Sequence, residues 1–118
     1  MVWSGRSLNE KQFENQVKKF LNSHNIWFTK IWGGGFQKAG IPDLICCING
    51  HFVAIELKGK GGKPTELQKY NIKKINECNG TGVILYPEQF ETFKLIILDL
   101  LHRRWLIETK CNNTIFTM

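Results

Sequence analysis

The chain has 118 residues, enough for a single domain that buries a hydrophobic core. Its hydrophobic residues (42%) and charged residues (22%) are typical of a globular protein, which excludes disorder over the whole chain. No stretch reaches the roughly 20 apolar residues of a membrane span, and the first residues lack the pattern of a secretion signal. We therefore expect a cytosolic protein, free or associated with the nucleoid. The net charge of +6 favours a polyanionic partner, most often nucleic acid.

The four cysteines are Cys46, Cys47, Cys78 and Cys111, and none of them forms a C-x-x-C pair. Zinc ribbons and zinc fingers are therefore not expected. In a protein without a secretion signal the cysteines are expected to be reduced, buried thiols. Cys46 and Cys47 should point to opposite faces of a sheet if they lie in a strand.

The first half of the chain predicts a helix, a strand and a hairpin. Ser7 and Glu10 fit a capping box, and apolar residues at helical spacing continue the helix over residues 8–23. Residues 27–32 are aromatic and β-branched, which favours a strand that the glycines at 33–35 end. Asn49-Gly50 separates two apolar runs, residues 44–48 and 51–58, and predicts a β-hairpin with a type I′ turn. Because the residues on both sides of each run are largely apolar, we expect the hairpin to be covered on both faces.

The second half predicts two more helices and two more strands. Thr65 and Gln68 fit a second capping box, opening a helix that ends near residue 78 before Asn79-Gly80. A short buried strand at residues 82–86, a helix at 88–102 and a strand at 105–108 follow. The expected fold is one α/β domain over residues 1–118, with a mixed sheet and helices on both sides. The helix is apolar nearly all round at residues 96–101, which favours burial against a second subunit in a homodimer.

The hairpin also predicts which side chains face one another. With Asn49 and Gly50 as the turn, cross-strand partners have residue numbers that sum to 99, so Asp43 lies opposite Glu56. Their Cβ atoms would be roughly 5 Å apart, and Lys58 would project from the same face. Two carboxylates this close repel each other, and Mg²⁺ or Mn²⁺ is a natural partner for them. The alternative is an ordinary ion-pair cluster at a strand end.

Pro42-Asp43, a gap of twelve residues and Glu56-Leu57-Lys58 match the PD-(D/E)xK nuclease motif. The flanking residues 40–44 and 54–58 resemble the virus-type replication-repair (VRR-NUC) branch and are similar to Holliday junction resolvases. The resemblance covers roughly residues 8–85. It implies a restriction-endonuclease-like core in the order α-β-β-β-α-β. It also implies metal-dependent hydrolysis of DNA phosphodiester bonds to leave 5′-phosphate ends, with branched or structured DNA as the plausible substrate.

The resemblance also implies a role for individual residues. Asp43 and Glu56 would bind Mg²⁺ or Mn²⁺ together with the Leu57 carbonyl, and Glu14 would be the helix acid that completes the metal site. Lys58 would orient the attacking water and stabilise charge at the phosphate. Gln68 would lie beside the site.

Two of these residues, and Glu10 near them in the sequence, have simpler interpretations. Gln68 could serve only its capping box, Glu14 could be plain helix surface, and Glu10 is assigned to the first cap. Three lysines in loops are expected to contact the nucleic-acid backbone, although solvated loop charge explains them equally well. These lysines are Lys38, Lys60 and Lys63.

Most of the four tryptophans are expected in the core or an interface rather than stacked on bases. The favoured function is a metal-dependent DNA endonuclease. The alternative is a module with the same fold that binds nucleic acid or a protein partner without catalysis. A purely DNA-binding surface gains nothing from carboxylates facing phosphates, which argues against that alternative.

Overall fold

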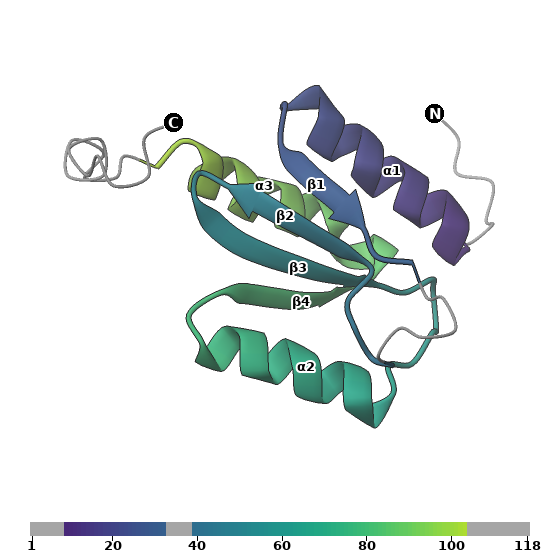
Figure 1. The fold of residues 1–118 in the computed structure, drawn as a ribbon. Coiled ribbons are helices and arrows are strands. Elements are labelled where there is room, and N and C mark those ends of the chain that lie inside the picture. The colour runs from purple at the N-terminus through teal and green to yellow at the C-terminus, as the bar shows by residue number, and fades with distance from the viewer. Residues whose placement is uncertain (1–8, 33–38, 104–118) are drawn as a thin grey trace.

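The computed structural model describes residues 9–32 and 39–103, and Figure 1 shows their arrangement. Their elements follow the predicted order α-β-β-β-α-β-α, with a four-stranded mixed sheet flanked by helices. The strand predicted at residues 105–108 lies outside the described residues. The elements are α1 (Glu10–Ser23), β1 (Trp27–Lys30), β2 (Leu44–Ile48), β3 (His51–Leu57), α2 (Glu66–Glu77), β4 (Thr81–Leu85), the 3-10 helix η1 (Pro87–Gln89) and α3 (Phe90–Leu101).

The strands lie in the order β1-β2-β3-β4, with β1, β2 and β3 antiparallel and β4 parallel to β3. The predicted hairpin register is confirmed, because Ile48 pairs with His51 and Leu44 pairs with Ile55. Asn49 and Gly50 have φ values of 53° and 80°, the left-handed conformation that a type I′ turn requires. The parallel connection from β3 to β4 passes through α2.

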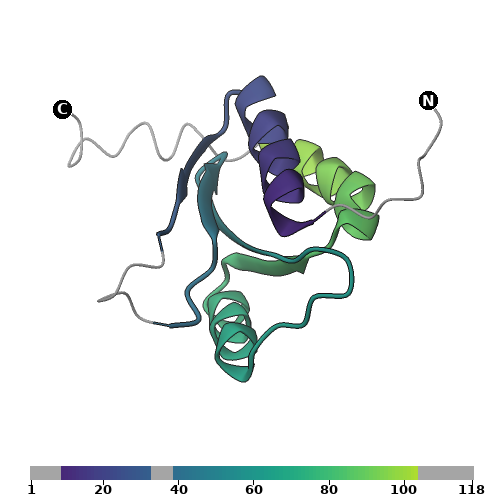
Figure 2. The ribbon, with the colours of Figure 1, turned by 90° about the vertical axis from the view of Figure 1, so that its right-hand side faces the viewer.

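Helices α1 and α3 lie on one face of the sheet and α2 lies on the other (Figure 2). The main core lies between the sheet and helices α1 and α3, and it includes Val53 and Ile55 of β3. Phe13 of α1 and Phe90 of α3 pack edge to face there, with ring centroids 5.4 Å apart. Because side chains alternate along a strand, Glu56 points to the opposite face, toward α2.

The start of α1 differs from the prediction. Asn9, rather than Ser7, is the N-cap, and its side chain accepts a hydrogen bond from the Gln12 N–H at 2.8 Å. The Gln12 side chain accepts the Asn9 N–H in return, so Gln12 takes the role predicted for Glu10. The physical reason is that asparagine is a strong N-cap, and a glutamine three residues on completes the box. Glu10 is therefore free of the cap.

The prediction that the hairpin is covered on both faces is wrong for part of it. Helix α2 packs mainly on β4 and less on β3, so it does not cover the far side of β2. Trp27, Cys47 and Phe52 pair in one row across β1, β2 and β3, and all three are exposed. The buried-thiol prediction consequently holds for Cys46, whereas Cys47 and Cys78 are exposed. Cys111 lies outside the described residues.

The tryptophans also differ from the prediction. Trp27 is 62% exposed and Trp32 is 77% exposed, so neither belongs to the core of this chain. Trp3 and Trp105 lie outside the described residues. On α3, Leu95 and Ile96 are exposed while Ile97 is buried, and a homodimer stays a prediction. Within residues 9–32 and 39–103, no helix combines the length and apolar character needed to cross a membrane.

Candidate active site

The candidate site lies where β2 begins and β3 ends. Asp43 directly precedes β2, and its side-chain Oδ2 accepts the backbone N–H of Leu57 at 2.8 Å. In a continued hairpin register Leu57 would face Pro42, but the ladder ends at the pair Leu44–Ile55. The Asp43 carboxylate therefore takes the place of a backbone partner for the last residue of β3. This bond fixes Asp43 beside Glu56, as the register predicts.

Glu56 is a buried carboxylate with an incomplete set of partners. It is only 2% exposed, and its Oε2 accepts a hydrogen bond from Gln68 Nε2 at 2.9 Å. Lys58 Nζ lies 3.4 Å from the same oxygen. The other oxygen, Oε1, is buried without a hydrogen-bond partner among the described residues. Burial and then the charge of Asp43 raise the pKa of Glu56 to about 7, although Lys58 opposes the rise.

Gln68 completes its capping box and also lies beside Glu56, and its functional role stays a prediction. Its Oε1 accepts the Thr65 N–H at 2.9 Å, which completes the capping box of α2. Its Nε2 donates to Glu56 from the same amide group. An amide can do both because it carries an acceptor and a donor, whereas a glutamate would offer acceptors only. The cap therefore orients the amide so that its donor faces the buried carboxylate.

Glu14 is not brought together with Asp43 and Glu56. It is buried, 4% exposed, so the alternative of plain helix surface is wrong. Its oxygens lie 2.7 Å from Lys30 Nζ and 2.7 Å from Lys18 Nζ. Burial acts to raise the pKa of Glu14, but the hydrogen bonds and charges of these lysines bring the pKa below its ordinary value. The structure thus places Glu14 in a separate ion-pair cluster.

Glu10 is the residue near the site that sequence reasoning missed. Partial desolvation and then the charge of Asp43 raise the pKa of Glu10, while Lys58 opposes the rise. These influences place the first turn of α1 within electrostatic reach of the site. The signal was present in the sequence, since Asn9 and Gln12 form a capping box that needs no glutamate.

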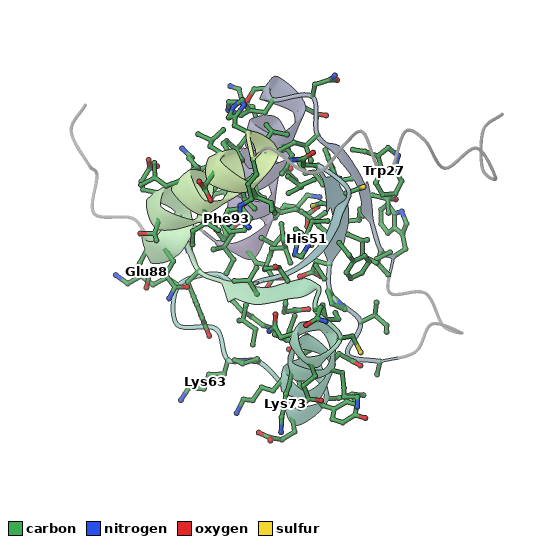
Figure 3. The ribbon with its side chains drawn as sticks, turned by 90° about the vertical axis from the view of Figure 1, so that its left-hand side faces the viewer. Trp27, His51, Lys63, Lys73, Glu88 and Phe93 are labelled. Carbon is green, nitrogen blue, oxygen red and sulfur yellow. The ribbon has the colours of Figure 1, made fainter. Side chains whose placement is uncertain are left out.

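The predicted nucleic-acid contacts are only partly described. Lys60 and Lys63 are exposed in the loop that follows Lys58, and Figure 3 shows Lys63 extending away from the sheet. Lys38 lies outside the described residues. The Leu57 backbone lies between Glu56 and Lys58, and the role of its carbonyl toward a metal stays a prediction.

The side chains at the site suit a divalent cation. Two adjacent carboxylates suit Mg²⁺ or Mn²⁺. A bound cation would also give the buried Oε1 of Glu56 the partner that it lacks among the described residues. Within the described ranges no cluster of three or more His, Cys, Asp or Glu side chains is arranged to share a metal. The protein therefore offers two carboxylates, and an ion here would complete its shell with water, backbone or substrate oxygens, as Mg²⁺ usually does.

Comparison of the chain with protein-family models, with curated proteins and with solved structures found no match. The geometry of Asp43, Glu56, Lys58 and Gln68 is therefore the basis for a functional proposal.

Proposed function

We propose that this protein is a metal-dependent DNA endonuclease with a restriction-endonuclease-like fold, of the PD-(D/E)xK superfamily and its VRR-NUC branch. One observation carries the proposal. The buried Glu56 carboxylate lies beside Asp43, its Oε2 is 3.4 Å from the Lys58 ammonium, and its Oε1 has no hydrogen-bond partner among the described residues. Such an arrangement costs stability in a protein that binds nothing there, and it suits a cation and a phosphate.

Asp43, Glu56 and the Leu57 carbonyl would hold Mg²⁺ or Mn²⁺. When bound, such an ion polarises a phosphoryl oxygen and lowers the pKa of a bound water. Lys58, only 11% exposed at its side chain, places a fixed positive charge where the attacked phosphate gains negative charge. Gln68 holds Oε2 of Glu56, whereas Oε1 has no hydrogen-bond partner among the described residues and would be open to the ion.

DNA is the proposed substrate because of the net charge of +6 and the exposed lysines after β3. Selectivity would then come from the shape of branched or structured DNA, or from two sites paired in a symmetric homodimer.

The second candidate is a binding or interaction module without catalysis. The row of Trp27, Cys47 and Phe52 favours it, because a row of exposed apolar side chains across three strands is typical of partner-binding surfaces. This row does not explain the buried carboxylate pair, and for that reason the nuclease is preferred.

The test is cleavage of labelled single-stranded, duplex, flap and four-way-junction DNA with Mg²⁺ or Mn²⁺, and with EDTA as a control. Glu56→Gln should lower the rate by at least about 100-fold, the range found when one electrostatic group is removed from an active site. The matched control is Glu66→Gln, because Glu66 is an exposed carboxylate paired only with Lys69 in the described structure. A folded wild-type protein that binds DNA but cleaves none of these substrates would contradict the proposal and favour the binding module.

A further inference from the structure

The loop after β3 is held in place, although its glycines suggest a flexible segment. We call residues 59–63 the lysine loop. The Gly62 N–H donates to the Gly59 carbonyl at 3.0 Å and closes a turn. The hydroxyl of Tyr86 donates to the Gly62 carbonyl at 2.8 Å. Gly61 has φ +77°, a conformation that a residue with a side chain rarely adopts, and it has open space around it.

Tyr86 comes from the neighbouring strand end. Strands β3 and β4 are parallel, so their carboxyl ends lie at the same edge of the sheet. The Lys58 N–H donates to the Leu85 carbonyl at 3.0 Å, one residue before Tyr86. The tyrosine is half-buried, and its hydroxyl reaches across this edge to the lysine loop.

The lysine loop also lies against the candidate site. A Cβ built at Gly62 would be 3.6 Å from both Cβ and Cδ of Lys58, so the turn rests on the stem of that side chain. Lys60 and Lys63 extend from the same turn and are exposed. Neither has an acidic partner within the part of the chain that the structure describes. The ammonium groups of Lys60 and Lys63 therefore lie in the loop that follows Lys58, whose own ammonium group lies 3.4 Å from Glu56.

We propose that Tyr86 is a positioning residue, and that it holds the lysine loop as a clamp for backbone phosphates on one side of the scissile phosphate. Lys60 and Lys63 supply the charge, and the Tyr86–Gly62 hydrogen bond fixes where that charge lies. A loop already ordered in the free protein loses less conformational entropy when it binds, which raises affinity. This inference rests on the proposed function for its ligand, a DNA strand.

The test compares the only two tyrosines of the chain. Tyr86→Phe removes the hydroxyl alone, and Tyr70→Phe is the matched control because Tyr70 is 55% exposed on α2. Binding to a fluorescent DNA junction is measured in EDTA at several salt concentrations. We expect Tyr86→Phe to weaken binding about threefold to tenfold, and Lys60→Ala with Lys63→Ala to lower the slope of log affinity against log salt by about two. Tyr70→Phe should bind as the wild type does.

A double-mutant cycle decides whether the hydroxyl acts through the lysines. Adding Tyr86→Phe to the variant that lacks both lysines should cause no further loss of affinity. A further loss there, or an unchanged affinity for Tyr86→Phe alone, would overturn the clamp. A fall in kcat without any change in affinity would also overturn it, because the bond would then act through Lys58 only. Binding is measured without metal, so its result does not depend on cleavage. An absence of cleavage would contradict the proposed nuclease, and the binding data would still decide whether Tyr86 positions the lysine loop.

Discussion

Glu14 and Glu56 are both buried glutamates, yet their surroundings differ. Glu14 is 4% exposed and has two lysine ammonium groups at 2.7 Å, so its pKa lies below the ordinary value. Glu56 is 2% exposed and has one lysine at 3.4 Å, with Asp43 beside it, so its pKa rises to about 7. Burial acts in the same direction on both residues, and the balance of neighbouring charges decides the outcome.

The comparison separates a structural carboxylate from a candidate functional one. The charge of Glu14 is compensated by the ammonium groups of Lys18 and Lys30 at 2.7 Å, although its Oε2 is, like Oε1 of Glu56, a buried oxygen without a hydrogen-bond partner among the described residues. The charge of Glu56 is only partly compensated, because Lys58 lies 3.4 Å from its Oε2, and its Oε1 has neither a hydrogen bond nor an ion pair in the described structure. A buried charge left short of partners is expensive, and such sites are common where a ligand supplies the missing charge.

The largest expected effect is a pH dependence of stability that belongs to Glu56. The folded pKa is about 7 and the ordinary value is 4.5, so the folded protein holds a proton that the unfolded chain has lost between these values. The free energy of unfolding should therefore fall as pH rises through this window, by about 3 kcal/mol at most.

Urea unfolding in EDTA between pH 4.5 and pH 8 measures this effect. The difference between the wild type and Glu56→Gln isolates it, because Glu10 and Glu14 are present in both proteins. Glu56→Gln should be at least as stable as the wild type at pH 8. If the difference in free energy of unfolding between the wild type and Glu56→Gln stayed constant with pH, the pH dependence would not belong to Glu56.

The next effect distinguishes the two glutamates by substitution. Glu14→Gln should lower the free energy of unfolding by about 1–3 kcal/mol, because it leaves two lysines without their partner. Mg²⁺ should still raise the melting temperature of Glu14→Gln as it does for the wild type, since a ligand of the folded state stabilises that state. Glu56→Gln should lose the Mg²⁺ effect. If Glu14→Gln also lost the Mg²⁺-induced rise in melting temperature, Glu14 would be a metal ligand, as the resemblance implies.

Much of this arrangement could be predicted from the sequence because it depends on local rules. The Asn49-Gly50 turn sets the hairpin register, and the register alone places Asp43 opposite Glu56. The capping box of Thr65 and Gln68 likewise sets the start of α2. In each case neighbours in the chain determine the geometry.

The errors arise where tertiary packing decides. Glu14 and Glu56 are the same residue type, and the approach of Lys30 from β1, which adds to the i,i+4 pair of Glu14 with Lys18, depends on tertiary packing. The exposure of Trp27 and Phe52 follows from the position of α2 over β3 and β4, which no periodicity reveals. Tyr86 reaches Gly62 across 24 residues of sequence, so composition alone suggested a flexible loop.

The smallest effect concerns Gln68, whose amide joins the cap to the site. Gln68→Glu keeps an acceptor for the Thr65 N–H but replaces the donor to Glu56 with a second carboxylate. It should lower the free energy of unfolding by about 1 kcal/mol at pH 8 and by much less at pH 5, where Glu56 is protonated.

The matched control for Gln68→Glu is Gln12→Glu, because Gln12 holds the same position in the capping box of α1 and is exposed. A glutamate there faces a helix N-terminus, so Gln12→Glu should be neutral or slightly stabilising at both pH values. Equal losses in the two variants would mean that Gln68 serves only its cap. A loss confined to Gln68→Glu and to high pH would show that the cost arises at the incompletely compensated charge of Glu56, which has one lysine at 3.4 Å where Glu14 has two at 2.7 Å.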